Sequence, residues 1–122
     1  MNARRPPDSA QAPRDVIAAH MTEEALQDNI IALCKTLRLG AYHTHNSQFS
    51  AKGFPDLVIA NGRRLYFVEL KNARRATTPE QDQWLDWLRV TGVDGPVKTF
   101  VWRPKDWLDG VVEEVLKEMA AA

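Results

Sequence analysis

The chain has 122 residues, and its 16 lysines and arginines balance 16 aspartates and glutamates, so its formal net charge at pH 7 is zero. This length predicts one domain with a modest core, and the overall charge does not by itself favour nucleic acid as a partner. No apolar run approaches the roughly 20 residues that cross a membrane, and no segment near the N-terminus is typical of a signal peptide. The single cysteine, Cys34, excludes an intrachain disulfide and a cysteine-based zinc site. We therefore expect an intracellular, cytoplasmic protein without a membrane partner.

The charges are unevenly spread along the chain. Between residues 52 and 75 there are six basic residues and two acids, and between residues 106 and 118 there are five acids and one lysine. The basic segment indicates a surface that can contact phosphate groups, although the solvated surface of a soluble protein can have the same composition. The acidic segment is typical of the solvent-facing side of a helix.

The first 20 residues combine proline, arginine and alanine without hydrophobic periodicity, so they predict a flexible tail before a domain that spans 21–122. Thr22 then starts a helical pattern as its N-cap, and Glu23 and Glu24 are favourable in the first turn. Gly40 is suited to end this helix. Apolar residues repeat at helical spacing between these ends (Leu26, Ile30, Leu33, Cys34 and Leu37).

A short strand is predicted over 41–45, and a polar loop follows it. His43 and His45 lie on one face of an extended strand, but two histidines without a third ligand do not predict a zinc site. A role of either histidine beside a phosphate or a water stays open against an ordinary place in the strand. The loop contains Asn46 and Lys52, whose side chains are of the kind that contact phosphate groups.

A β-hairpin is the clearest local prediction. The apolar runs 57–60 and 65–70 flank Asn61 and Gly62, a dipeptide that favours a two-residue type I′ turn. Gly53 lets the chain turn into the first of these strands.

The register of that hairpin brings three charged residues together. With a two-residue loop, Asp56 pairs with Phe67 and lies diagonally from Glu69, on the face that Lys71 shares. A three-residue loop would turn Asp56 to the other face. Two converging carboxylates beside an ammonium group predict a site for a hard divalent cation, Mg²⁺ or Mn²⁺.

A basic loop with Arg74 and Arg75 follows the hairpin, and a helix is then predicted from Thr78. Pro79 suits the first helical position, and Gln81 can complete a capping box with Thr78. This local role of Gln81 and a role near a reacting phosphate do not exclude each other. The helix carries apolar residues that indicate core packing or a dimer contact (Trp84, Leu85, Trp87 and Leu88).

A strand is predicted over 97–102, Pro104 ends it, and a final amphipathic helix is predicted over 106–119. The order is therefore helix, strand, hairpin, helix, strand, helix. This order predicts an α/β fold in which a central mixed β-sheet is flanked by helices.

Several of these residues form a recognisable set. Pro55-Asp56 followed by Glu69-Leu70-Lys71 matches the PD-(D/E)xK pattern of restriction-endonuclease-like nucleases. Together with the segments 53–57 and 78–81, the chain resembles the VRR-NUC family of that superfamily, in its stand-alone phage or bacterial type. The likeness covers roughly residues 22–108. It implies the restriction-endonuclease-like αβββαβ core.

The resemblance also implies roles for individual residues. Asp56, Glu69 and the backbone carbonyl of Leu70 would hold Mg²⁺ or Mn²⁺, and an acid on the first helix, Glu23, could approach the metal. Catalytic roles beside the metal would fall to Lys71 and Gln81. Contacts with DNA would come from the basic and polar residues around the site (Lys52, Arg74, Arg75, His43 and Asn46).

The function that the resemblance implies is a metal-dependent, structure-selective DNA endonuclease that leaves a 5′-phosphate. Its small stand-alone members resemble Holliday-junction resolvases, in which a homodimer places two sites on branched DNA. A nickase or flap nuclease acting as a monomer is the alternative among enzymes. Two other classes stay open: a DNA-binding module that does not cut, and an adaptor that binds a partner through its acidic C-terminal helix. The adaptor predicts no metal binding at Asp56 and Glu69.

Overall fold

The computed structural model describes residues 11–44 and 51–122. They form five helices and four strands in the order α1 (Gln11–His20), α2 (Glu23–Thr36), β1 (Gly40–His43), β2 (Leu57–Ala60), β3 (Leu65–Leu70), α3 (Pro79–Thr91), β4 (Val97–Trp102), α4 (Pro104–Leu108) and α5 (Val111–Ala121).

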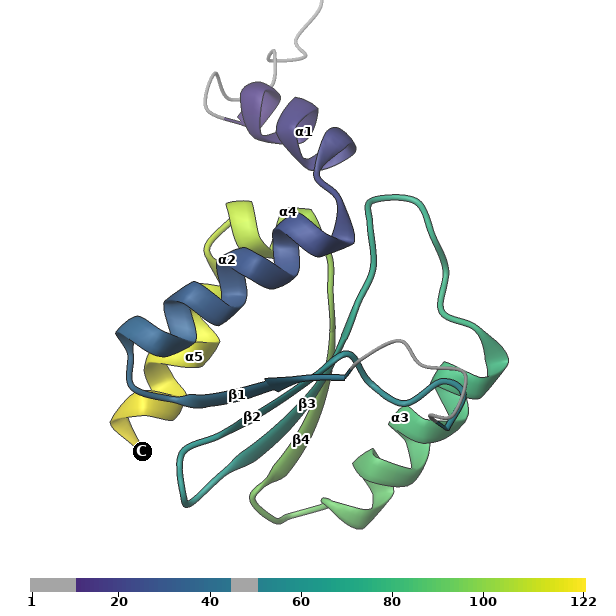
Figure 1. Cartoon of the computed structure of the whole chain (residues 1–122), viewed down its shortest axis with the longest axis vertical. Coiled ribbons are helices and arrows are strands. Elements are labelled where there is room, and N and C mark those ends of the chain that lie inside the picture. The colour runs from purple at the N-terminus through teal and green to yellow at the C-terminus, as the bar shows by residue number, and fades with distance from the viewer. Residues whose placement is uncertain (1–10, 45–50) are drawn as a thin grey trace, which may run out of the picture.

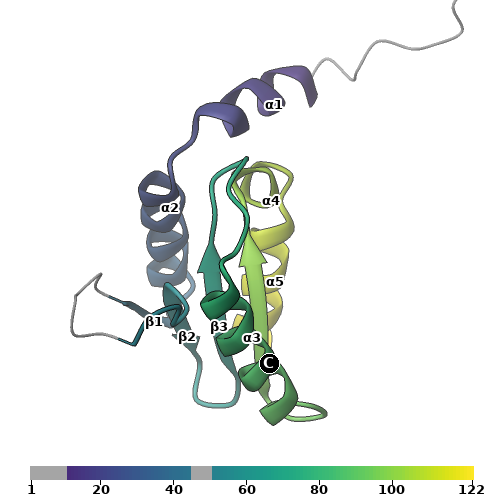
Figure 2. The ribbon, with the colours of Figure 1, turned by 90° about the vertical axis from the view of Figure 1, so that its right-hand side faces the viewer.

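The strands form one mixed sheet in the order β1-β2-β3-β4. The pairs β1–β2 and β2–β3 are antiparallel, and β3 and β4 are parallel. A parallel pair needs a crossover connection, and α3 provides it on one face of the sheet, whereas α2 and α5 lie on the other face (Figures 1 and 2). The prediction of an α/β fold with a central mixed sheet flanked by helices is confirmed.

The main core lies between the sheet and the pair α2 and α5. Side chains alternate along β3, so Tyr66, Val68 and Leu70 point into this core and are at most 2 % exposed. The helices contribute buried apolar side chains, and those of α2 belong to the stripe that the sequence predicts (Leu26, Ile30 and Cys34 from α2; Val112, Leu116 and Met119 from α5). The buried thiol of Cys34 confirms its assignment to the core.

Helix α2 begins as predicted and ends earlier. The Thr22 hydroxyl accepts a hydrogen bond from the backbone N–H of Ala25 at 3.0 Å, so the predicted N-cap is confirmed. The C-cap is Leu37, and Arg38 adopts a left-handed conformation with φ 61°. Gly40 therefore does not end the helix but starts β1, because an arginine provides the left-handed residue that we expected of the glycine.

The hairpin has a four-residue loop, so the predicted two-residue turn is wrong. Ala60 pairs with Leu65, and residues 61–64 form the loop. The cause is the Asn61 side chain, whose Oδ1 accepts hydrogen bonds from the backbone N–H groups of Arg63 and Arg64 at 2.8 and 2.6 Å. A local turn built by an asparagine side chain competes with the two-residue hairpin turn.

The shift in register preserves the face on which the charged residues lie. The observed pairing differs from the predicted one by two residues, and a shift of two returns every side chain to the same face. Val58, instead of Asp56, lies opposite Phe67. Leu57 pairs with Val68, so the next residue pair in the same register places Asp56 directly opposite Glu69.

The expected flexible tail over 1–20 is wrong for residues 11–20, which form helix α1. Residues 1–10 lie outside the described part. Helix α1 packs against α4, with Ala18 buried and ion pairs joining Arg14 to Asp109 at 3.3 Å and Lys105 to Asp15 at 3.4 Å. Val16 and Ile17 on α1 are mostly exposed, so the segment lacks the apolar stripe that would have revealed a helix in the sequence.

The final helix is also divided, against the prediction of one helix over 106–119. Helix α4 starts with Pro104 at its first position and ends at Leu108, and Gly110 with φ 83° separates it from α5. Only glycine adopts this left-handed conformation without strain. The break turns α5 so that its apolar stripe covers β2 and β3.

Candidate active site

The candidate site is at the ends of β2 and β3 that lie away from the hairpin loop. The Oδ2 atom of Asp56 accepts a hydrogen bond from the backbone N–H of Leu70 at 2.8 Å, so this carboxylate continues the strand pairing beyond β2. Thr44, the residue after β1, holds the turn that carries Asp56. Its hydroxyl donates to the Pro55 carbonyl at 2.8 Å, and its backbone N–H donates to the Asp56 carbonyl at 2.8 Å.

Gly53 fixes this turn against helix α3. Its φ of 87° is in the left-handed region, and a Cβ atom at this position would lie 2.5 Å from the carbonyl carbon of Glu80. A larger residue is excluded both by conformation and by space. The Pro55-Asp56 segment and the first turn of α3 are therefore held close together.

Glu69 and Lys71 form a buried pair. Their side chains are 2 % and 1 % exposed, and the Lys71 Nζ atom lies 3.7 Å from Glu69 Oε2. Within the described residues, Glu69 Oε1 has no hydrogen-bond partner although it is buried. A buried polar atom without a partner is costly, so this oxygen is suited to a ligand that the chain itself does not supply.

The electrostatics of the pair reflect its burial. Desolvation raises the pKa of the Glu69 carboxyl to about 8, and the neighbouring Asp56 carboxylate acts in the same direction. The Lys71 ammonium lowers this pKa, but its effect is smaller than that of burial. At neutral pH the metal-free site therefore favours a proton on Glu69, because burial and the neighbouring charge of Asp56 together outweigh the effect of Lys71.

The two carboxylates fit a divalent cation. In the described ranges, no three His, Cys, Asp or Glu side chains lie together so as to hold a metal ion. Mg²⁺, however, is commonly bound by one or two carboxylates and several waters. Asp56 and the unpartnered oxygen of Glu69 supply two such ligands, and the Leu70 carbonyl is an oxygen of the right kind beside them.

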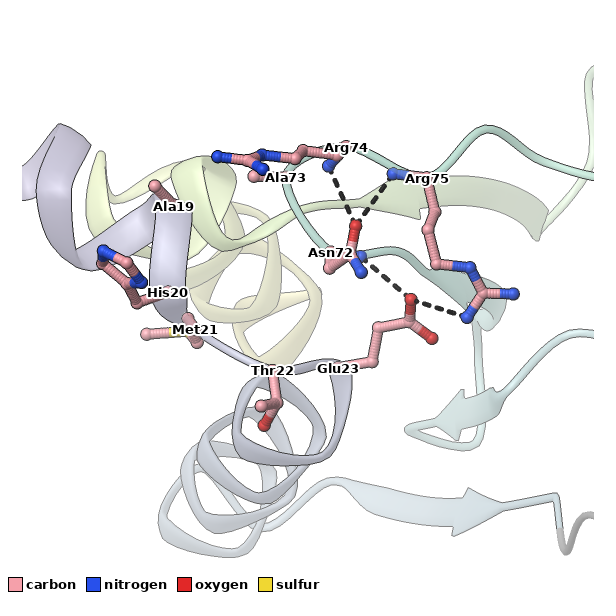
Figure 3. Close-up of a pocket in the computed structure, with 9 residues that line it drawn as sticks. All are labelled: Ala19, His20, Met21, Thr22, Glu23, Asn72, Ala73, Arg74 and Arg75. Atoms are coloured by element: carbon pink, nitrogen blue, oxygen red, sulfur yellow. Dashed lines mark hydrogen bonds and ion pairs between the residues drawn. The ribbon is translucent and has the colours of Figure 1, made fainter.

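Asp56 is accessible from a cavity of about 300 Å³ between α2 and the ends of β1 and β3, whereas Glu69 and Lys71 are buried. Gln27 and His43 also line this cavity. Glu23 lines it as well, so this residue of α2 lies near Asp56, and its approach to a metal stays a prediction. Glu23 Oε2 already accepts hydrogen bonds from Asn72 N at 3.1 Å and Arg75 Nη1 at 3.3 Å. Figure 3 shows both contacts.

Gln81 forms the capping box that the sequence predicts. Its Oε1 accepts a hydrogen bond from the backbone N–H of Thr78 at 2.8 Å, and its own N–H donates to the Thr78 hydroxyl at 3.2 Å. The amide oxygen of Gln81 is thus committed to the helix cap. The side-chain NH₂ group takes no part in the cap, so it can donate a hydrogen bond to a phosphate oxygen or a water.

The predicted DNA-binding residues lie in different settings. Lys52 is 83 % exposed and forms an ion pair with Glu80 at 3.3 Å. His43 is half-buried and stacks on Tyr42. Arg74 and Arg75 are exposed on the loop after β3. Asn46 and the second histidine of the predicted pair, His45, lie outside the described residues.

The basic segment does not surround the site as a whole. Arg63 and Arg64 are in the hairpin loop, about 15 Å from Asp56 along the strand at roughly 3.3 Å per residue. Only the arginines after β3 are near the carboxylates. Of the four arginines in the basic segment, Arg74 and Arg75 therefore lie near the site, and Arg63 and Arg64 do not.

Two residues near the site were not singled out in the sequence. The Asn72 side chain accepts hydrogen bonds from the backbone N–H groups of Arg74 and Arg75 at 2.9 and 2.8 Å. The Arg103 guanidinium donates to the carbonyls of Asn72 and Arg75 at 2.8 and 2.7 Å. Asparagine favours turns because its side chain can bind the backbone N–H two residues later, so the role of Asn72 could have been inferred from the sequence. Nothing local reveals Arg103, which is 31 residues from Asn72.

The tryptophans separate into core and surface. Trp102 is 3 % exposed and Trp107 packs against the core. Trp102 is therefore too buried to take part in a dimer contact. Trp87 is 53 % exposed on α3, beside Trp84. In the described part of the chain, no helix is both long and apolar enough to cross a membrane.

Comparison of the chain with family models, with curated proteins and with solved structures found no match.

Proposed function

We propose that the protein is a metal-dependent endonuclease that hydrolyses phosphodiester bonds in DNA. The observation that carries the proposal is the buried oxygen of Glu69, which has no hydrogen-bond partner among the described residues and lies in a site shared with Asp56 and Lys71. The resemblance of Pro55-Asp56 and Glu69-Leu70-Lys71 to the PD-(D/E)xK pattern supports the same chemistry. The order α2-β1-β2-β3-α3-β4 is also the order of the αβββαβ core.

Asp56, Glu69 and the Leu70 carbonyl would hold Mg²⁺ or Mn²⁺. When bound, such an ion lowers the pKa of a water and neutralises charge on a phosphate. Asp56 is held for this task by its hydrogen bond to the Leu70 N–H. Glu69 must lose its proton when the metal binds, so the affinity for metal should rise with pH up to about 8.

Lys71 and Gln81 would act on the reacting groups themselves. The Lys71 ammonium is a compact charge that can orient the attacking water or stabilise the charge that grows on the phosphate. Burial strengthens this interaction because the local dielectric is low. The Gln81 NH₂ group can donate to the water or to a phosphate oxygen while its carbonyl keeps the helix cap.

The substrate that we propose is branched DNA, cut by a homodimer in the manner of a Holliday-junction resolvase. A dimer has a physical reason, because one site of this kind cuts one strand. The exposed Trp87 and Trp84 beside it provide an apolar part of α3 for such a contact. A monomer that nicks DNA or cuts flaps is the alternative.

Cleavage of labelled DNAs tests the proposal. Four-way junctions, flaps, nicked, single-stranded and plain duplex DNA would be incubated with Mg²⁺, Mn²⁺ or EDTA. Glu69→Gln is the test variant, and Glu118→Gln is its control because Glu118 is 72 % exposed on α5. Metal-dependent, symmetric cutting of junctions that only Glu69→Gln abolishes is expected. Cutting of flaps instead would replace the substrate and keep the site.

Two further results would contradict the proposal. If no DNA is cut and calorimetry detects no Mg²⁺ or Mn²⁺ binding that depends on Asp56 and Glu69, the site is not a nuclease centre. Sedimentation tests the homodimer separately. A monomer at micromolar concentration, with and without junction DNA, would exclude the resolvase and leave the monomeric nuclease.

A further inference from the structure

A second cavity lies beside the candidate active site. It has a volume of about 490 Å³ and lies between the junction of α1 and α2 and the loop 72–75 (Figure 3). His20 lines it from α1, and Arg74 and Arg75 line it from the loop. Glu23 lines both this cavity and the one that contains Asp56, so the two cavities share a wall.

The loop 72–75 is built as a fixed structure. Asn72 Oδ1 accepts the two backbone N–H groups of Arg74 and Arg75, and the Arg103 guanidinium binds the carbonyls of Asn72 and Arg75. The backbone N–H of Asn72 donates to Glu23. Five hydrogen bonds thus hold four residues. A loop that is ordered before its ligand binds loses less entropy on binding.

The two arginines of the loop have different partners. Arg75 turns toward Glu23 and pairs with it at 3.3 Å, whereas the Arg74 side chain leaves the loop in the opposite direction (Figure 3). Across residues 11–44 and 51–122, the Arg74 guanidinium makes no hydrogen bond or ion pair, and it is exposed. Arg74 is therefore the available cation of the cavity, and Arg75 neutralises the shared wall.

The charge of the cavity favours an anion. The guanidinium groups of Arg74, Arg75 and Arg103 lie on or behind the loop, against the single carboxylate of Glu23. A guanidinium binds phosphate oxygens in a planar, bidentate manner, and each such bond is charge-assisted. His20 lines the cavity from the α1 side, and Figure 3 shows its ring turned away from the loop, so Arg74 is the cation that faces a ligand.

We propose that this cavity is a phosphate-binding subsite in which Arg74 binds a nucleotide phosphate of the strand that passes the Asp56–Glu69 site. The inference rests on the proposed function for the identity of the strand. Arg75 does not bind this phosphate but positions Glu23 between the two cavities. The phosphate is an internal one of the strand or a terminal one, since both have the same oxygens.

Binding without cleavage tests the subsite. The ¹⁵N-labelled protein would be titrated in EDTA with inorganic phosphate and followed by the backbone amide signals in NMR spectra. We expect shifts at residues 72–75 and 20–23, where the cavity lies. Shifts elsewhere, or none, would overturn the proposal.

The matched variants are Arg74→Gln and Arg63→Gln. Each arginine is exposed, lies two residues after an asparagine, and has its backbone N–H bound by that asparagine side chain. Binding of a fluorescent single-stranded oligonucleotide of ten nucleotides would be measured in EDTA at several salt concentrations. Arg74→Gln should weaken the affinity about tenfold and reduce the salt slope by roughly one contact, while Arg63→Gln should change it less than twofold. Equal effects of the two variants would refute the subsite.

Oligonucleotides with a 5′-phosphate and with a 5′-hydroxyl distinguish the two sources. Equal affinities assign an internal phosphate, and tighter binding of the phosphorylated strand, lost in Arg74→Gln, assigns a terminal one. The outcome is separable from that of the proposed function. A protein that binds through Arg74 but cuts no DNA keeps the subsite and loses the nuclease, and a protein that cuts but is indifferent to Arg74→Gln does the reverse.

Discussion

The two loops that bound β3 have nearly the same local sequence and different roles. Asn61-Gly62-Arg63-Arg64 precedes the strand, and Asn72-Ala73-Arg74-Arg75 follows it. In each, the asparagine Oδ1 accepts the backbone N–H groups of both arginines. The local sequence decides the turn in both cases, and the tertiary surroundings decide what the turn is used for.

The surroundings differ in which other groups of each asparagine are bound. Asn61 Nδ2 donates to the Met119 carbonyl at 2.7 Å and fastens the hairpin to the end of α5. Asn72 uses its backbone instead, with its N–H on Glu23 and its carbonyl on Arg103. The first loop therefore anchors the core, and the second joins the elements that surround the carboxylates.

Lys71 gives the largest expected effect, because it lies at the end of β3 that carries the candidate site. Lys71→Met keeps the length of the side chain and removes its charge. If the proposed chemistry is right, cleavage should fall by about 100-fold or more. The matched loss of charge at the other end, Arg63→Gln, should leave the cleavage rate within twofold. Similar rates for both variants in a gel-based cleavage assay would contradict the assignment of Lys71.

The same end should make stability depend on pH. The pKa of Glu69 is raised from 4.5 to about 8 in the folded protein, so between these values the folded state keeps a proton that the unfolded state has released. The metal-free protein should therefore lose stability as pH rises from about 4.5 to 8, with a slope that corresponds to at most about one proton. Urea denaturation at several pH values measures this slope.

Glu69→Gln should flatten the slope, and Glu118→Gln should leave it unchanged. Glutamine keeps the shape of the carboxylic acid and has no proton to release in this range. A slope that survives Glu69→Gln would show that another group titrates, and the raised pKa would then be assigned wrongly.

The two asparagines provide the direct comparison of the loops. Asn61→Ala removes three hydrogen bonds, one of them to α5, and should lower the free energy of unfolding by about 1–3 kcal/mol without changing oligonucleotide affinity. Asn72→Ala should cost less stability, about 1 kcal/mol, but weaken oligonucleotide binding about fivefold because the loop that presents Arg74 loses its order. Denaturation and fluorescence anisotropy on both variants separate the roles. The comparison fails if the two variants behave alike.

The smallest effect is expected at an exposed ion pair of the first loop. Arg64 lies 3.9 Å from Glu118, which is 72 % exposed. Arg64→Gln should change stability by less than about 0.5 kcal/mol, since exposed ion pairs contribute little. A loss above 1 kcal/mol in thermal or urea unfolding would show that Arg64 has a further role in the hairpin, for example through its hydrogen bond to Tyr66.

The features that the sequence predicted correctly are local ones. The Thr22 cap and the capping box of Thr78 and Gln81 each depend on residues three positions apart. The strands β2, β3 and β4 follow from apolar runs bounded by turn residues. The sequence also predicted that Asp56, Glu69 and Lys71 lie on one face of the sheet. This prediction depends only on the alternation of side chains along a strand, which a register shift of two residues does not change.

The features that it missed depend on distant partners. The hairpin loop is held by Met119, 58 residues from Asn61. Helix α1 is stabilised on α4 by the pair of Asp15 and Lys105, 90 residues apart. Arg103 reaches the loop 72–75 from the start of α4. No window along the sequence contains both members of such a contact, so the pattern of either one alone does not indicate it.

The period of two along the strands limits which alternative pairings this sequence could adopt without losing the site. A slip of β2 against β3 by two residues keeps Asp56 on the face of Glu69, whereas a slip by one residue would turn it into the apolar layer under α2 and α5. The misfolded states that separate the two carboxylates are therefore also the states that bury a charge in the core, so they are the least stable of the alternative pairings.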